Sequence, residues 1–155
     1  MSLWLLAAAI AANPTLAGLT GTSVRAELDA AMGGFAQSYA VVGPGVEFTG
    51  HAGGTSVALD VSDSTLIFEI VNAAPGNDFN PDGAVNMGLR GLQLSNLTAA
   101  DGPVSALTLI SSTFPPGTFD SLTVAAGAVS WKAPALIMPG RGTVWRAVWE
   151  IGKRP

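Results

Sequence analysis

The chain has 155 residues, of which 48% are hydrophobic and 12% are charged, so we expect one folded domain with a sizeable core and exclude a disordered chain. The formal net charge is −4 and no cluster of Lys and Arg interrupts it, which argues against nucleic acid as a partner because phosphate binding needs a basic surface. Cysteine is absent, which excludes disulfides, thiolate nucleophiles and thiolate metal sites.

The chain begins with an apolar segment at residues 3–12 that is too short to span a bilayer. Small residues follow where a signal peptidase reads them, so we expect a signal peptide over residues 1–17, a short apolar helix cleaved before Gly18. The first basic residue is Arg25, which leaves the α-amine as the positive charge of the signal; the alternative is a buried first helix of the mature protein. The signal peptide predicts an exported protein whose mature domain, residues 18–155, has no transmembrane segment.

Alternation of polar and apolar residues predicts a series of short strands in that domain. The first is expected over residues 19–29, where Val24 and Leu28 alternate with Arg25 and Asp29. Further strands are expected over residues 35–42, 46–49, 56–61, 65–71, 89–97, 104–111, 122–125, 129–133 and 143–151. A flexible turn is expected at residues 51–54, and Gly91 indicates a bulge or a close backbone approach.

The clearest unit is a β-hairpin over residues 56–71. Ser62-Asp63-Ser64 has the short polar side chains of a turn, and apolar residues occupy every second position on both sides of it. One face of the hairpin is expected to carry Val57, Leu59, Val61, Leu66, Phe68 and Ile70. A second sheet must cover that face.

Eight to ten short strands separated by glycine and proline turns predict the fold class. We expect an all-β protein, an antiparallel β-sandwich of jelly-roll or Greek-key type. The long segment between residues 72 and 86 has little strand character and is expected to be a loop, where binding tends to occur.

That loop contains the one metal-binding pattern of the sequence. Asp78, Asn80 and Asp82 alternate and are followed by Gly83, which resembles the start of a calcium loop with three oxygen ligands. Leu89 occupies the position at which an EF-hand has its bidentate glutamate, so the expected calcium affinity is weak. The alternative is a polar loop without a metal, since the same residues favour turns.

The tryptophans suggest a carbohydrate site. Trp145 and Trp149 lie four residues apart on one predicted strand, hence on one face, where two rings form a stacking platform for sugars. The opposite face carries Arg146 and Glu150, and since charges belong outside, this pattern favours the core for the tryptophan face. Trp131 is a third candidate for glycan binding.

Catalytic patterns are weak. His51 is the single histidine, it lies beside glycines, and no G-x-S-x-G motif accompanies it, so a Ser-His-Asp site would depend on this residue alone. Phosphate-binding glycine motifs are absent from the sequence. A pair of carboxylates of the glycosidase type stays open as an alternative, because eleven acidic residues are present and their pairing depends on the fold. We expect a protein that is not an enzyme.

Three phrases resemble a known family when taken together. They are residues 39–48, YAVVGPGVEF, residues 59–68, LDVSDSTLIF, and residues 91–97, GLQLSNL. In this order they resemble the exported domains of bacterial PEP-CTERM proteins. The resemblance implies an exported bacterial β-sandwich with no catalytic residues to transfer. The sorting signal of that family, a Pro-Glu-Pro followed by an apolar span and an arginine cluster, has no counterpart before Pro155, so we expect a fragment or a relative without an anchor.

Three functions follow from the sequence, in order of preference. The first is a non-enzymatic exported protein that acts through its surface at the bacterial cell surface or in the extracellular matrix, with extracellular polysaccharide or envelope proteins as partners. The second is a carbohydrate-binding module, and the third is a hydrolase. Calcium is the one cofactor that the sequence suggests.

Overall fold

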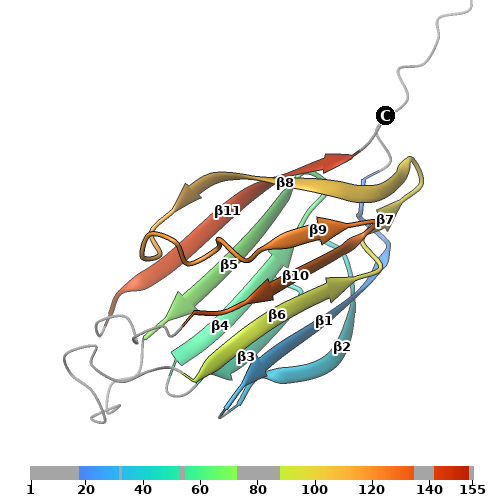
Figure 1. Cartoon of the computed structure of the whole chain (residues 1–155). Coiled ribbons are helices and arrows are strands. Elements are labelled where there is room, and N and C mark those ends of the chain that lie inside the picture. The colour runs from blue at the N-terminus through green and yellow to red at the C-terminus, as the bar shows by residue number, and fades with distance from the viewer. Residues whose placement is uncertain (1–17, 32, 53–54, 73–87, 135–141, 154–155) are drawn as a thin grey trace, which may run out of the picture.

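The computed structural model describes residues 18–31, 33–52, 55–72, 88–134 and 142–153. Within these ranges the chain forms strands and turns without a helix (Figure 1). The expected all-β class is therefore confirmed for this part of the chain, whereas the helix expected in residues 1–17 lies outside it. Among the described residues, no helix is long and apolar enough to cross a membrane.

Eleven strands occur in the described residues, one more than the upper end of the expected range, because a two-residue strand precedes the longest one. The strands are β1 (Ser23–Ala30), β2 (Phe35–Val41), β3 (Phe48–Ala52), β4 (Thr55–Val61), β5 (Thr65–Val71), β6 (Leu89–Ser95), β7 (Thr98–Ala99), β8 (Gly102–Ser112), β9 (Thr123–Ala125), β10 (Ala128–Lys132) and β11 (Val144–Lys153).

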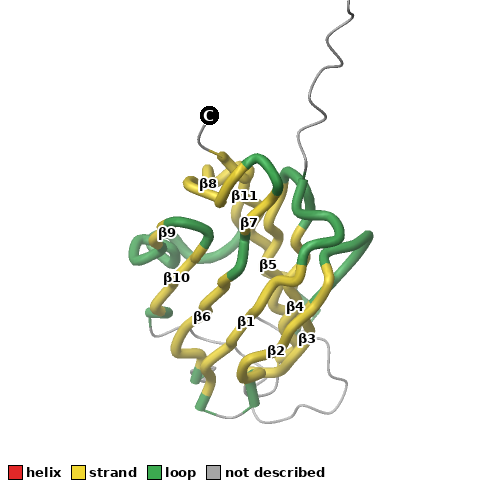
Figure 2. The backbone as a smooth tube through the Cα atoms, turned by 90° about the vertical axis from the view of Figure 1, so that its right-hand side faces the viewer, coloured by secondary structure: helices red, strands yellow, loops and turns green. Residues whose placement is uncertain are grey.

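These strands form two antiparallel sheets that lie face to face (Figures 1 and 2). The five-stranded sheet has the order β2-β1-β6-β10-β9, and the six-stranded sheet has the order β3-β4-β5-β11-β8-β7. One cluster of buried apolar side chains lies between them, with Val24 and Leu94 from the first sheet and Phe68 and Ile70 from the second. Every second residue of a strand faces this core, which is why the alternating sequence produces two layers.

The hairpin predicted over residues 56–71 is confirmed. β4 pairs with β5 in antiparallel register up to the Val61–Leu66 pair, and all six apolar residues of the expected face are buried. The turn uses the predicted serine, because the Ser62 hydroxyl accepts a hydrogen bond from the Thr65 N–H at 2.9 Å and the Ser62 N–H donates to the Thr65 carbonyl at 2.8 Å. Local hydrogen bonding of this kind lets the chain reverse within three residues.

The prediction for β3 was wrong in position. The expected strand at residues 46–49 and the expected turn at residues 51–54 are replaced by a strand that runs through His51 and Ala52. These two residues pair with Ser56 and Thr55 of β4, so the gain from sheet pairing extends the strand beyond the glycine that interrupts the pattern. Gly53 and Gly54, the end of the expected turn, lie outside the described residues.

The crossover between the sheets at residues 113–122 contributes two aromatic rings to the core. Phe114 stacks on Phe68 of β5 with ring centroids 5.7 Å apart, and Phe119 packs edge-on against Trp149 of β11 at 4.8 Å. Large aromatic side chains bury much apolar surface, so these two rings anchor the connection to the core.

Candidate functional site

The proposed calcium ligands Asp78, Asn80 and Asp82 lie outside the described residues. Leu89, at the position of the missing bidentate acid, is buried in β6. In the parts of the chain that the structure describes, no group of three or more histidine and acidic side chains could hold a metal ion.

The three candidate tryptophans lie in or beside the core. Trp131 on β10 and Trp149 on β11 are 3% and 4% exposed, and Trp145 is half-buried against Phe114 at 5.5 Å. The indole N–H of Trp131 donates a hydrogen bond of 2.8 Å to the Thr118 carbonyl, which satisfies its polar atom inside the protein. This packing favours the core alternative for the tryptophan face, since a sugar platform needs exposed rings.

His51 is exposed on β3, at the edge of the six-stranded sheet. Its backbone carbonyl accepts a hydrogen bond from the Gly34 N–H, and its Cα is paired with that of Ser56. The described contacts of His51 are therefore those of an edge strand that joins the two sheets at this corner.

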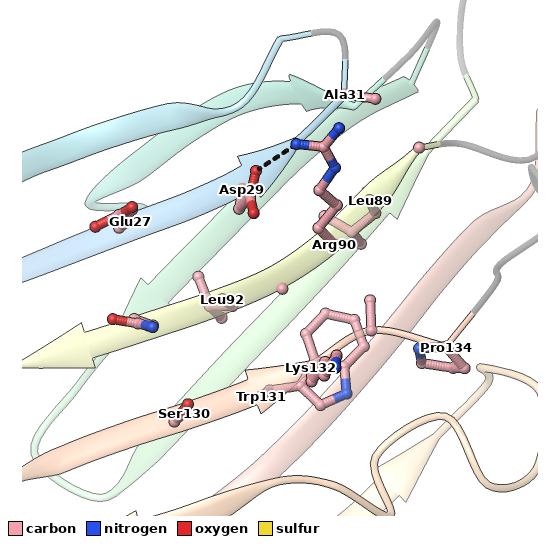
Figure 3. A pocket seen from close by; sticks show the side chains of 14 residues that line it. Glu27, Asp29, Ala31, Leu89, Arg90, Leu92, Ser130, Trp131, Lys132 and Pro134 are labelled. Atoms are coloured by element: carbon pink, nitrogen blue, oxygen red, sulfur yellow. Dashed lines mark ion pairs between the residues drawn. The ribbon is translucent and has the colours of Figure 1, made fainter.

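A trough of mixed polarity lies on the outer face of the five-stranded sheet, across β1, β6 and β10 (Figure 3). Its volume is about 690 Å³. It is bordered by the polar side chains of Glu27, Asp29, Arg90, Gln93, Ser130 and Lys132. These side chains stand outward because the alternate residues of the same strands, such as Leu28, Leu92 and Trp131, are buried in the core.

Where it borders the trough, β6 carries a glycine and an irregular register. A Cβ atom on Gly91 would lie 2.5 Å from the backbone carbonyl of Trp131, so this position must lack a side chain. The register of β6 against β1 also shifts, since Asp29 pairs with Gly91 and Ala30 pairs with Leu89. Arg90 is the extra residue of this bulge, and the bulge directs its side chain outward. The bulge and the close backbone approach expected at Gly91 are therefore both confirmed.

Charges of both signs face each other across the trough. Arg90 Nη1 lies 3.7 Å from Asp29 Oδ1, and both side chains are more than half exposed, at 64% and 56%. An ion pair this exposed contributes little to stability because water screens it. Either side chain can therefore leave its partner and bind a ligand at little cost in free energy. Glu27 adds a second acid on β1 and Lys132 a second base on β10, which leaves the trough without net formal charge.

The chemistry of the border groups defines what the trough can bind. Arg90 and Lys132 are hydrogen-bond donors, Glu27 and Asp29 are acceptors, and Gln93 and Ser130 are both. Such a surface suits a polar ligand that offers donors and acceptors at close spacing, as hydroxyl-rich molecules do. It does not suit a polyanion, which would meet two carboxylates.

The outer face of the six-stranded sheet carries a cluster of acidic side chains around Asp60. Burial raises the pKa of Asp60 on β4 above its usual value, neighbouring Glu47 raises it further, Arg146 lowers it and Glu69 raises it. Arg146 Nε lies 3.7 Å from Glu69 Oε2 at the surface. Arg146 thus offsets part of the mutual repulsion of three carboxylates.

Sequence reasoning missed Arg90, Gln93, Ser130 and Lys132 as site residues. The alternation of polar and apolar residues in the sequence shows that these side chains point outward. It does not show that they lie close together. β6 pairs with β1 on one side and with β10 on the other, and neither is its neighbour in the sequence. Comparisons with protein-family models, curated proteins and solved structures found no match for this chain.

Proposed function

We propose that this protein is an exported, non-enzymatic bacterial β-sandwich protein that acts at the cell surface or in the extracellular matrix by binding a polar ligand in the trough. The observation that carries this proposal is the trough itself. It is an open cavity of about 690 Å³ with hydrogen-bond donors and acceptors on three strands. A rigid sheet holds these groups in fixed positions, as a binding surface requires. The resemblance to exported PEP-CTERM domains supports the location.

A Greek-key type of sandwich is part of this proposal. The chain moves from one sheet to the other between β2 and β3 and again between β5 and β6. As a result, strands that are distant in sequence, such as β5 and β11, become neighbours. This pattern of connections is typical of Greek-key sandwiches, which present binding surfaces on an outer face or at their loops.

Export is tested by the mass of the product. Protein recovered from outside the cytoplasm of a bacterial host should begin at Gly18. Intact mass spectrometry measures this directly. A folded product that keeps residues 1–17 would contradict the proposal.

The role of the trough is tested with a pair of variants on one sheet. Ser130→Tyr places a ring in the trough, whereas Thr123→Tyr places the same ring on β9, at an exposed residue that pairs with Ser130 but does not border the trough. Tagged wild-type protein and Thr123→Tyr should stay with the envelope or matrix fraction, and Ser130→Tyr should appear in the medium. Equal association of all three proteins would contradict binding through the trough.

A carbohydrate-binding module is the second candidate, and the composition of the trough favours it. Carboxylate, guanidinium, amide and hydroxyl groups together match the alternating donors and acceptors of sugar hydroxyls. A glycan array with the same three proteins tests it. Specific binding by wild-type protein and Thr123→Tyr, lost in Ser130→Tyr, would assign this function, and absence of any glycan signal would leave the first candidate with a ligand that is not a sugar.

A further inference from the structure

Near the end of the six-stranded sheet lies a long strand, β8, most of whose outer edge pairs with no other strand in the described residues, although β9 of the other sheet lies close to it. β8 pairs with β11 on one side, and on the other side β7 covers its first two residues alone, by pairing with Gly102 and Pro103. Val104 also uses its outer edge, because its N–H donates to Leu97 and its carbonyl accepts from Gly127 N–H, both at 2.9 Å. From Ser105 to Ser112 no second strand pairs with β8 within the described residues, and both views place β8 at the rim of the sheet (Figures 1 and 2).

This edge lacks one feature that usually prevents strand addition, namely charged side chains, although β8 bulges against β11 at Ser105 and Ile110. None of the eleven residues of β8 is charged, and Leu109 and Ile110 are 47% and 59% exposed. Edge strands of monomeric proteins are commonly protected by charges, which oppose pairing with another chain. A protein with a net charge of −4 repels its own copies in general, and β8 brings no carboxylate of its own to a contact, although Glu150 of β11 pairs with Thr108 and Asp120 borders the adjacent groove.

The sequence of the edge is symmetric in polarity about Thr108. Ala106 and Leu107 precede this threonine, and Leu109 and Ile110 follow it. In an antiparallel pair of identical strands centred on Thr108, Leu107 faces Leu109 of the other copy and Ala106 faces Ile110. Residues that face each other lie on the same side of the sheet, so each apolar residue meets an apolar residue and threonine meets threonine.

A groove lined by apolar side chains and also by Ser112 and Asp120 lies beside the same edge. Leu107 and Leu109 form one wall of a cavity of about 490 Å³, and Trp149, Phe114, Phe119 and Leu122 form much of the rest. A second β8 strand placed along the edge directs its own Leu107 and Leu109 to the same side of the sheet. These leucines then cover the mouth of the groove and remove apolar surface from water.

We propose that two copies of this chain associate through antiparallel pairing of β8, with a two-fold axis at Thr108. The pairing joins the two six-stranded sheets into one continuous sheet. An antiparallel pair of identical strands is two-fold symmetric by its geometry, so the interface closes as a dimer and does not extend into a filament. Because apolar residues flank Thr108 in the same way on both sides, β8 matches a second copy of itself better than it matches an unrelated strand.

The oligomeric state tests the proposal. Sedimentation velocity of the purified protein over a range of concentrations should show a monomer–dimer equilibrium. Thr108→Lys should weaken it at least about tenfold, because it sets two ammonium groups opposite each other at the axis. Thr49→Lys is the matched control, since Thr49 is an exposed threonine on β3 at the opposite edge of the same sheet, and it should leave the dimer intact. A monomer at all concentrations, or equal dimerisation of both variants, would overturn the proposal.

Cross-linking tests the register independently of stability. The chain has no cysteine, so a single introduced cysteine reports one position. Thr108→Cys should form a disulfide-linked dimer under mild copper–phenanthroline oxidation, because the two copies of this residue face each other. Ala106→Cys should not, since its two copies lie four residues apart along the strands, about 13 Å. A disulfide at Ala106→Cys but not at Thr108→Cys would reject this interface, as would equal cross-linking of Thr49→Cys.

Discussion

The carboxylate of Glu47 accepts a hydrogen bond of 2.7 Å from the backbone N–H of Val61, at the end of β4. Its second oxygen accepts a bond of 3.0 Å from the N–H of Gly43, in the connection between the two sheets. One side chain therefore ties the connection from β2 to the hairpin. This explains structurally why a glutamate stands next to the glycine-rich turn in the phrase VVGPGVEF.

Glu47→Ala should destabilise the protein by about 1–3 kcal/mol, because it leaves two backbone N–H groups without their acceptor in a half-buried place. Urea denaturation followed by circular dichroism measures the change. Glu150→Ala, at an exposed position of β11, serves as the control and should change stability little. Equal losses in the two variants would show that the Glu47 bonds do not stabilise the fold.

Asp60 should make the protein less stable as pH rises. Burial, with a further contribution from Glu47, raises its pKa above 3.8 in the folded chain, so the folded state holds the proton more tightly than the unfolded state. This contribution is complete below pH 3.8 and is lost as pH rises through the folded-state pKa. Denaturation midpoints of the wild type and Asp60→Asn between acidic and neutral pH test it. The variant should gain stability relative to the wild type toward neutral pH, and a constant difference would refute the assignment.

Gly91→Ala should damage both the five-stranded sheet and the trough. The new methyl group would lie 2.5 Å from the Trp131 carbonyl, a backbone atom that cannot move without disturbing β10, so we expect a loss of about 1–3 kcal/mol. Gly43→Ala is the control, because its nearest neighbour would be the Val41 carbonyl at 4.0 Å. Thermal unfolding of both variants gives the comparison. A Gly91→Ala protein as stable as Gly43→Ala would disprove the close approach.

Trp131→Phe should cost about 1–3 kcal/mol, because it leaves the buried Thr118 carbonyl without its indole donor. Trp131→Ala should cost about 3–5 kcal/mol, since it also opens a cavity beside Phe68 and Phe119. Urea denaturation measures both. Trp145→Phe, at a half-buried ring, should have the smaller effect. Wild-type stability of Trp131→Ala would remove this residue from the core and reopen its role in glycan binding.

Calcium binding by the loop is tested by metal removal. Thermal unfolding in EDTA and then in several millimolar calcium should show a higher melting temperature with calcium, because a ligand that binds the folded state stabilises it. The increase should be lost in Asp78→Ala and Asp82→Ala. With few protein oxygens the affinity should fall in the weak range of about 10⁻⁴ to 10⁻³ M. The absence of a shift in the wild type, or the same shift in both variants, would assign the loop to ordinary turn chemistry.

The local parts of the fold could be predicted from the sequence. The hairpin of β4 and β5 follows from alternation around Ser62-Asp63-Ser64, and its register depends on residues only a few positions apart. The inward face of β11 follows in the same way from Trp149 and its charged neighbours. The first error concerns β3, where pairing with β4 extends the strand across Gly50.

The trough could not be predicted, for a physical reason. Its acids lie on β1 and its bases on β6 and β10, and only the pairing of these strands brings Asp29 within 3.7 Å of Arg90. Alternation tells which residues face outward but carries no information on which strands become neighbours. Likewise, the open edge of β8 depends on the strand order and not on the sequence of β8 alone.

The position of β6 also sets the order in which the protein can fold. Arg25 of β1 pairs with Ser95 of β6, and Trp131 of β10 pairs with Leu92, so the centre of this sheet joins segments from both halves of the chain. Contacts this distant in sequence slow folding, because a long loop must close before they form. The hairpin can therefore form early, while the trough appears only after β10 has been synthesised. If the chain crosses a membrane from its N-terminus, β10 emerges after β1 and β6, so the sheet that carries the trough can be completed only once most of the chain has emerged.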